Sequence, residues 1–265
     1  MISYILIVIF SIPLFAFSEN LNTSELPLPK SQSSIQNQKI RRDATYRGIE
    51  FQKNSTPFEK LFANGDLLFI RSTSSQSKAL EEVTKSTWTH VGILFKAKKH
   101  SHRWILDESG AWYVLEAGPV VRMNPVKSFI AQKAFSVLRL SETKNIYKDR
   151  KAFEEKLFQS ATSRLGKKYD IYFLLSRDSG QTKDDEDYCS ELTWYAFAKV
   201  GYILGYTQKI GELDLSGSAT KALIQKRFSG KNAPGFLQWK EQLVIPPQSQ
   251  YDSPLLEEVS FKVKN

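Results

Sequence analysis

Strands are expected early in this chain and helices late, and that order leaves few folds open. Short apolar runs that predict strands lie at residues 67–70, 90–95 and 137–140. Helices are indicated at residues 149–165 and 189–200, where apolar side chains recur three and four positions apart. A doubly wound parallel sheet would instead alternate strands and helices throughout. The sequence therefore predicts an α+β domain.

Two further apolar runs lie between these strands. Residues 104–106 and 112–115 flank Glu108-Ser109-Gly110, and a short stretch of this kind is typical of a turn between paired strands. We therefore expect a β-hairpin whose turn is Glu108-Ser109-Gly110.

The chain begins with an apolar segment at residues 2–17. This is shorter than the roughly 20 residues of a membrane-spanning helix and fits a secretory signal peptide. Small residues at Ala16 and Ser18 predict cleavage after Ser18, so that residues 1–18 are removed and the protein is secreted or periplasmic. The segment has no basic side chain before its apolar core, which leaves an uncleaved anchor or a buried helix as alternatives.

Composition sets the remaining boundaries. Residues 19–45 are rich in Ser, Asn, Gln and Pro and are interpreted as a flexible linker. Residues 46–250 are expected to form one hydrolase-sized domain, and residues 251–265 a C-terminal tail. With 41% hydrophobic and 25% charged residues, the chain is not collagen-like or wholly disordered.

The chain carries a net charge of +9, from 37 Lys and Arg against 28 Asp and Glu. Such a charge favours anionic partners, including nucleic acid, phospholipid headgroups and wall polymers. The basic residues are dispersed and match no nucleic-acid-binding motif, so no nucleic-acid partner is expected. Peripheral contact with an anionic surface remains a hypothesis.

Cys189 is the only cysteine, so an exported form of this chain has no internal disulfide. The residue is either a small buried hydrophobe or a nucleophile. Asp187 could cap the predicted helix and place Cys189 in its first turn, where the helix dipole favours a thiolate. The acidic run at residues 184–187 would raise the pKa of the thiol, and it is interpreted as a solvated loop, with a calcium-binding loop as the alternative.

His90 is the histidine best placed to act as a base. It heads a predicted strand and shares one face with Gly92, which leaves space for a substrate or a second side chain. His100 and His102 lie in a basic segment that predicts a solvated turn. The alternative for His90 is a purely structural role.

Glu116 ends another predicted strand. If that strand lies beside the one headed by His90, the carboxylate could accept a hydrogen bond from the imidazole and fix its tautomer. The alternative is a solvated acid at the end of a strand.

Four segments occur in an order and spacing that resemble one family. They are Gly65-Asp66-Leu67-Leu68-Phe69, Ser86-Thr87-Trp88-Thr89-His90-Val91-Gly92-Ile93, Val114-Leu115-Glu116-Ala117 and Tyr188-Cys189-Ser190-Glu191-Leu192. Together with the Gly166-Lys167-Lys168-Tyr169-Asp170 stretch, they resemble the YiiX-like permuted papain-type amidases, relatives of the NlpC/P60 cysteine hydrolases, over roughly residues 60–205.

The resemblance implies a circularly permuted papain-like (NlpC/P60-type) fold, with an antiparallel sheet packed against helices. It implies Cys189 as nucleophile, His90 as base and Glu116 as the third polar residue. These residue types can cleave an amide bond through a thioester without a metal or organic cofactor. The resemblance gives Asp66 and Tyr188 no role that we can derive.

Three functions fit this set of residues. The first is a secreted amidase or peptidase that acts on peptide-type bonds, including those of a cell wall. The second is a lipid-directed acyltransferase or thioesterase, and the third is a binding module without catalytic activity. An apolar substrate groove would favour the lipid-directed function, and an open polar groove the peptide-directed one.

Overall fold

The computed structural model describes residues 58–131, 134–141, 149–175, 185–230 and 233–259. The predicted signal peptide at residues 1–18 and the predicted linker at 19–45 lie outside these residues. No helix among the described residues is long and apolar enough to cross a membrane.

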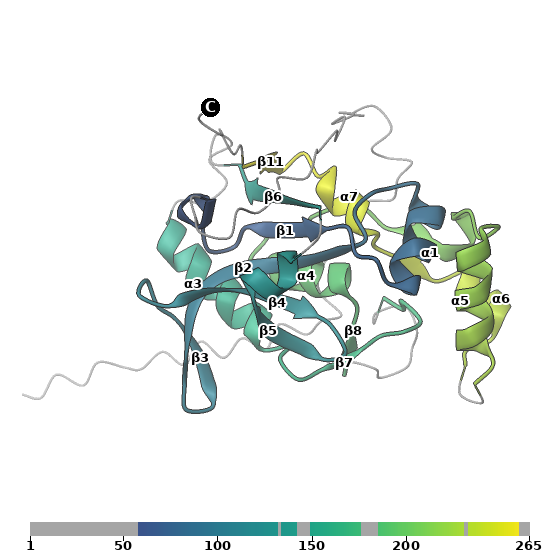
Figure 1. The fold of residues 1–265 in the computed structure, drawn as a ribbon, viewed down its shortest axis with the longest axis horizontal. Coiled ribbons are helices and arrows are strands. Elements are labelled where there is room, and N and C mark those ends of the chain that lie inside the picture. The colour runs from purple at the N-terminus through teal and green to yellow at the C-terminus, as the bar shows by residue number, and fades with distance from the viewer. Residues whose placement is uncertain (1–57, 132–133, 142–148, 176–184, 231–232, 260–265) are drawn as a thin grey trace, which may run out of the picture.

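One antiparallel sheet organises the domain (Figure 1). Its strands follow the order β11-β6-β1-β2-β4-β5, and β3 pairs with the far end of β2. The strands are β1 (Leu67–Ile70), β2 (His90–His100), β3 (Arg103–Leu106), β4 (Ala111–Ala117), β5 (Val121–Pro125), β6 (Phe135–Leu140) and β11 (Leu256–Glu258). The prediction of an α+β domain with an antiparallel sheet packed against helices is confirmed.

Helices and short strand pairs complete the fold. The helices are α1 (Ser75–Thr84), α2 (Val126–Ile130), α3 (Arg150–Thr162), α4 (Cys189–Ala198), α5 (Ser218–Phe228), α6 (Phe236–Lys240) and α7 (Pro247–Tyr251), with 3-10 turns η3 (Phe58–Leu61) and η5 (Ile210–Glu212). Two small sheets pair β7 (Lys168–Tyr169) with β8 (Glu186–Asp187), and β9 (Gln208–Lys209) with β10 (Leu243–Val244).

Both faces of the central strands are buried. On β2, Val91 and Ile93 face the main core, to which α3 and α4 contribute Leu157 and Leu192. Leu94, on the opposite face, packs in a second cluster with the side chains of α2. Because successive side chains of a strand alternate between faces, this double burial explains why β1 and residues 91–95 of β2 carry no charged or polar side chain.

The predicted hairpin at Glu108-Ser109-Gly110 is wrong. Strands β3 and β4 do not pair with each other. Each pairs with β2 instead, through Lys98↔Ile105 and Lys96↔Trp112. The reversal occurs instead between β2 and β3 at residues 101–102, the basic turn, where Ser101 adopts a left-handed conformation with φ of 53°. Gly110 allows the chain to pass close to β2, since a Cβ there would lie 2.4 Å from the Ala97 carbonyl oxygen.

The predicted C-terminal tail at 251–265 begins too early. Tyr251 is 1% exposed and its ring meets Phe69 edge-to-face, with ring centroids 5.3 Å apart. Strand β11 then pairs with β6 in the register Leu256↔Leu140. The sequence signal is weak because β11 is short and partly charged, as an outermost strand usually is. The domain therefore includes residues 251–259.

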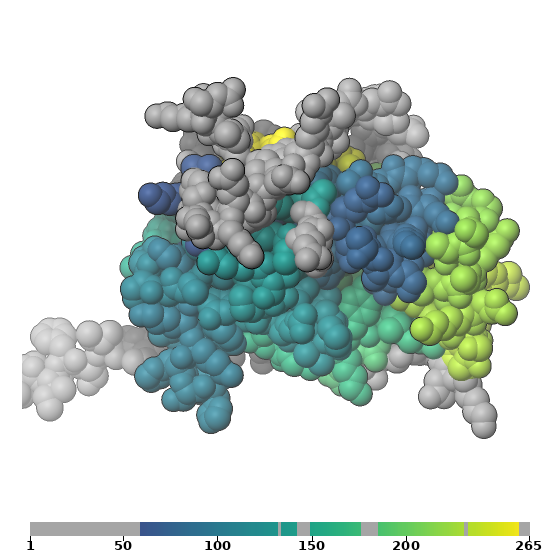
Figure 2. All heavy atoms as spheres, in the orientation of Figure 1, coloured from purple at the N-terminus to yellow at the C-terminus, as the bar shows by residue number. Residues whose placement is uncertain are grey.

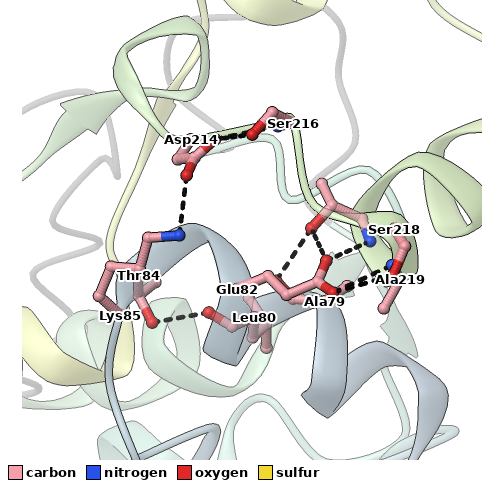
Figure 3. A network of polar contacts seen from close by, with 10 residues as sticks. Ala79, Leu80, Glu82, Thr84, Lys85, Asp214, Ser216, Ser218 and Ala219 are labelled. Carbon is pink, nitrogen blue, oxygen red and sulfur yellow. Dashed lines mark hydrogen bonds and ion pairs between the residues drawn. The ribbon is translucent and has the colours of Figure 1, made fainter.

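Helices α1 and α5 lie side by side at one end of the domain, and Figure 2 shows them forming a continuous surface. The Glu82 carboxylate of α1 accepts hydrogen bonds from the backbone N–H groups of Ala219 and Thr220, at 3.1 and 2.8 Å (Figure 3). Lys85 forms an ion pair with Asp214 nearby, at 2.7 Å. Glu82 thus caps α5 from the neighbouring helix, where the helix dipole favours a carboxylate.

Candidate active site

Cys189 is the first residue of α4, and Tyr188 is the N-cap of that helix. The N–H groups of the first helical turn have no partner within the helix, so the helix start presents partial positive charge to the thiol. Asp187 does not cap α4, contrary to our expectation. It is fully buried and accepts two hydrogen bonds from the Arg164 guanidinium, one of them from Nε at 2.8 Å.

The acidic run before the cysteine is therefore not simply a solvated loop. Asp185 is exposed, but Asp187 lies in β8 and its charge is paired with Arg164. Asp184 falls outside the described residues. Because Arg164 balances the nearest of these carboxylates, the run does not oppose a thiolate at Cys189 in the way its charge alone suggests.

His90 lies beside Cys189. The imidazole forms a hydrogen bond with the thiol, which also accepts one from the Val91 N–H. Burial alone would raise the pKa of Cys189, but the positive charge and hydrogen bond of His90 lower it below its usual range. A thiolate paired with an imidazolium is therefore favoured before substrate arrives.

Glu116 orients the histidine from the opposite side. Its Oε2 lies 2.8 Å from His90 Nε2, which leaves Nδ1 as the nitrogen that faces the thiol. Burial opposes a charged imidazole, but Cys189 and Glu116 together raise the pKa of His90 to about 9. The face of the His90 ring packs on Phe129 of α2, with ring centroids 5.4 Å apart.

The register of β2 and β4 explains how Glu116 reaches His90. Ile93 pairs with Leu115, so Glu116 lies next to Gly92 and diagonally across from His90. A Cβ on residue 92 would be 3.5 Å from the Glu116 Cβ and much closer to Val114. Residues of β4 fill the space beside Gly92. This space therefore holds protein side chains and backbone, and no substrate.

Two residues of β5 hold the other carboxylate oxygen of Glu116. Arg122 Nη2 and Asn124 Nδ2 donate to Oε1 at 2.9 and 2.8 Å. Burial would raise the pKa of Glu116, but His90 and Arg122 lower it to about 2. Sequence reasoning missed both partners, although their spacing of two residues on a strand places them on one face.

Tyr169 is a further side chain of the site that the sequence did not reveal as functional. Strand β7 pairs with β8 so that Tyr169 lies opposite Asp187, two residues before the cysteine. Burial raises the pKa of Tyr169, and the nearby negative charge of Cys189 raises it further. Its hydroxyl accepts a hydrogen bond from Gln76 Nε2 at 2.6 Å. The Tyr169 hydroxyl therefore keeps its own proton for another acceptor, and the side chain packs against the core cluster that includes Cys189.

Residues 62–260 match the model of a family of permuted papain-like amidase enzymes, YaeF/YiiX. This chain belongs to that family. The match confirms the predicted permuted papain-like fold, in which His90 precedes Cys189 along the chain. It spans most of the described domain, including the strand β11 that sequence reasoning had excluded.

Two Escherichia coli proteins are similar to this chain. YiiX of strain K-12, described as uncharacterized, is 34% identical over 199 residues, which cover 74% of this chain and 85% of YiiX. The crystal structure of yiiX from Escherichia coli O157:H7, described as a metalloprotein, has a TM-score of 0.60 and 32% identity. That match covers 75% of this chain and 97% of the solved one.

A metal site does not follow from the residues of this chain. In the part of the chain that the structure describes, no group of three or more His, Cys, Asp or Glu side chains could hold a metal ion. His90 and Glu116 are bonded to each other, and Arg122 and Asn124 occupy the remaining carboxylate oxygen. The described residues therefore do not fit a metal centre, and we derive no step through one.

Asp66 and Tyr188, to which the resemblance gave no role, have structural partners. The Asp66 carboxylate receives two hydrogen bonds from Arg139 of β6, at 2.7 and 2.9 Å, and one from the Ala63 N–H. The Tyr188 hydroxyl accepts a hydrogen bond from the Ile245 N–H at 3.1 Å. Asp66 thereby ties the start of β1 to β6, and Tyr188 fixes the start of α4.

An apolar pocket lies near the start of α4, but Cys189, His90 and Glu116 do not line it. It lies between α1, α5, residues 171–173 and α6, and Arg227 is the only charged residue among those that line it. Phe173 forms part of the wall, and its ring packs edge-to-face on both Tyr169 and Tyr188, at 6.3 and 5.5 Å. The pocket is therefore one aromatic layer away from the start of α4.

Proposed function

We propose that this protein is an exported cysteine hydrolase that cleaves amide bonds through Cys189, His90 and Glu116 and a thioester intermediate. The observation that carries the proposal is the position of His90, hydrogen-bonded to the Cys189 thiol and to the Glu116 carboxylate. This is the arrangement of nucleophile, base and orienting group that nucleophilic catalysis needs. Export is inferred only from the apolar segment at residues 2–17.

The reaction begins with the thiolate. The sulfur of Cys189 attacks the carbonyl carbon, a C–S bond forms, and the carbonyl electrons move to oxygen. The backbone N–H of Cys189 at the start of α4 and the hydroxyl of Tyr169 are the donors available to stabilise this oxyanion.

The His90 imidazolium then gives its proton to the leaving amine. The C–N bond breaks and the acyl group remains on sulfur as a thioester. Neutral His90 next takes a proton from water, which attacks the thioester and releases the acid. Glu116 stays ionised throughout, because its low pKa keeps it negative while it stabilises the imidazolium.

The apolar pocket supports a second candidate function, the lipid-directed one. A pocket lined almost entirely by apolar side chains suits an acyl chain better than a charged peptide. The same thioester could then be transferred to water or to an alcohol or amine. A binding module without catalysis is disfavoured. In such a module His90 would serve only packing, and its interaction with a buried thiol and a carboxylate would have no function.

Intact-mass analysis with two substrate classes tests both functions. The protein is incubated with p-nitrophenyl octanoate and, separately, with a polar peptide p-nitroanilide, and its mass and product release are followed. An acyl adduct on wild type that is absent from Cys189→Ala supports the hydrolase. Turnover of the octanoyl ester alone favours the lipid-directed function, and equal turnover by Cys189→Ala contradicts both.

A further inference from the structure

Tyr169 can help at the oxyanion only if its O–H proton points toward the reaction centre. On that basis, which rests on the proposed function, we propose that Gln76 and Arg227 are positioning residues that fix the direction of this proton. Gln76 lies in the first turn of α1 and Arg227 in the last turn of α5. Neither lies in a segment that the sequence had marked for chemistry.

Two short hydrogen bonds connect the three side chains. Arg227 Nη2 donates to Gln76 Oε1 at 2.6 Å, and Gln76 Nε2 donates to the Tyr169 hydroxyl at 2.6 Å. A guanidinium has donors only, so the amide must turn its oxygen toward Arg227. Its nitrogen then faces Tyr169 and must donate, because an amide nitrogen cannot accept.

The direction of the hydrogen bond from Gln76 restricts where the Tyr169 O–H proton can point. The hydroxyl oxygen accepts from Gln76, so its proton cannot lie on the line to Gln76 and must point elsewhere. The pairing of β7 with β8 places Tyr169 opposite Asp187, two residues before Cys189, and its side chain packs against the core cluster that includes Cys189. The O–H is therefore available to a negative sulfur or to an oxyanion formed on it.

Arg227 is held so that it can perform this role. Its guanidinium carbon lies 4.8 Å from the centroid of the Phe173 ring, a cation–π contact. The charge of Asp170 also acts on Arg227, and the Asp170 carboxylate accepts a hydrogen bond from the Tyr172 N–H at 2.7 Å. Arg227 is half-buried, and its contacts with Gln76 and Phe173 replace part of the hydration that its guanidinium loses.

The fold keeps the two helices in place for this chain of bonds. Glu82 caps α5 from α1, beyond the first turn of α1 that carries Gln76 (Figure 3). The Gln76–Arg227 bond is thus a further link between the same two helices. Arg227, at one end of this chain of bonds, also lines the apolar pocket.

The decisive variant is Gln76→Glu, which keeps the shape of the side chain. A carboxylate beside Arg227 stays ionised and can only accept, so Tyr169 would have to donate to it and turn its proton away from Cys189. Removal of one oxyanion donor costs roughly 10²–10³ in kcat in a known case. We expect Gln76→Glu to lower kcat on p-nitrophenyl octanoate about as far as Tyr169→Phe does, with KM within about twofold and Tm unchanged or higher.

Three comparisons make this result specific. Gln225→Glu introduces the same charge at an exposed position of α5 and should leave kcat unchanged. Gln76→Glu should cost nothing further in the Tyr169→Phe background, because both changes remove one interaction. Arg227→Lys keeps a donor for the amide oxygen and should retain more activity than Arg227→Met.

The inference is overturned if Gln76→Glu retains wild-type kcat, whether or not Tyr169→Phe does. It is also overturned if the double variant loses the full product of the two single effects. Failure of the proposed function gives a different result, since Cys189→Ala would then retain turnover.

Discussion

Gly92 of β2 lies so close to Val114 of β4 that no residue with a Cβ atom fits at position 92. A Cβ on residue 92 would stand 2.4 Å from Val114 Cγ1 and 2.8 Å from the Leu115 carbonyl oxygen. Real Cβ atoms do not approach backbone so closely, and the backbone of β4 cannot withdraw without disturbing Glu116. The glycine therefore sets the separation at which Glu116 meets His90.

Gly92→Ala should consequently damage both stability and activity. Overpacking of a well-packed interior costs about 1–3 kcal/mol, and displacement of β4 would lengthen the contact between Glu116 and His90. Urea unfolding and turnover measure the two effects. Gly118→Ala is the control, because a Cβ there would meet Arg122 at an ordinary 3.5 Å. Equal stability of the two variants would contradict the packing argument.

Cys189→Ala should abolish hydrolysis and leave the domain folded. The side chain is buried and small, and its replacement by alanine removes a single sulfur atom. Turnover of p-nitrophenyl octanoate and the thermal unfolding midpoint are measured on the same preparation. Loss of activity together with loss of folding would show only that the cysteine is structural.

His90→Ala should make Cys189 alkylate more slowly near neutral pH. The imidazolium lowers the pKa of the thiol, so in wild type the thiolate persists to lower pH than in the variant. Iodoacetamide labelling between pH 5 and 10, followed by mass spectrometry, gives the two curves. The wild-type curve should rise at lower pH. Superimposable curves would mean that the two side chains do not interact.

Glu116→Gln should lower kcat by about 10 to 100-fold, less than the roughly 10⁴ lost when the acid of a Ser-His-Asp triad is removed. The loss is smaller because the thiolate–imidazolium pair exists before substrate binds. The pKa of His90, about 9 in the wild type, should fall in the variant because a neighbouring carboxylate favours the charged ring. The alkaline limb of the pH–rate profile should therefore move to lower pH. Identical profiles for wild type and Glu116→Gln would mean that Glu116 has only a structural role.

The same variant changes how stability depends on pH. The pKa of Glu116 is about 2 in the folded protein and about 4.3 in an unfolded chain, so its contribution is present above pH 4.3 and is lost as pH falls toward 2. His90 has the opposite sign, since its pKa is raised. Its contribution is complete below about pH 6.5 and is lost as pH rises through 9. Urea unfolding of Glu116→Gln should show a flatter acid limb than wild type.

Arg164→Met should destabilise the domain by about 3–5 kcal/mol, because it leaves the Asp187 carboxylate buried without its partner. The added change Asp187→Leu should restore much of the loss, since it removes the buried charge. The exposed pair Arg71–Glu81 is the control, and Arg71→Met should cost less than about 1 kcal/mol. Similar costs for the two arginines would contradict the role assigned to burial.

The central strands and the positions of His90 and Glu116 could be predicted because each leaves a local signal. Apolar alternation marks a buried strand, and a histidine or glutamate at its end is visible in the sequence. The strand pairing that joins these two residues brings together segments about 25 positions apart, and the sequence offered it only as a condition, which the family resemblance then favoured.

Other parts of the site could not be predicted because they depend on tertiary contacts. Tyr169 and Gln76 are 93 positions apart and meet only when α1 packs beside the β7–β8 pair. Asp187 had the right chemistry for a helix cap, but a buried arginine 23 positions earlier takes its carboxylate. Local propensity does not show whether the Asp187 carboxylate binds the helix start or a distant arginine.

Strand β6 lies between β1, which starts at Leu67, and β11, which ends at Glu258. The sheet is therefore completed by a segment that emerges from the ribosome some 190 residues after the first strand. Contacts this distant in sequence slow folding and leave strand edges open to other chains in the meantime. The edge of β6 therefore stays open until residues 256–258 arrive to cover it.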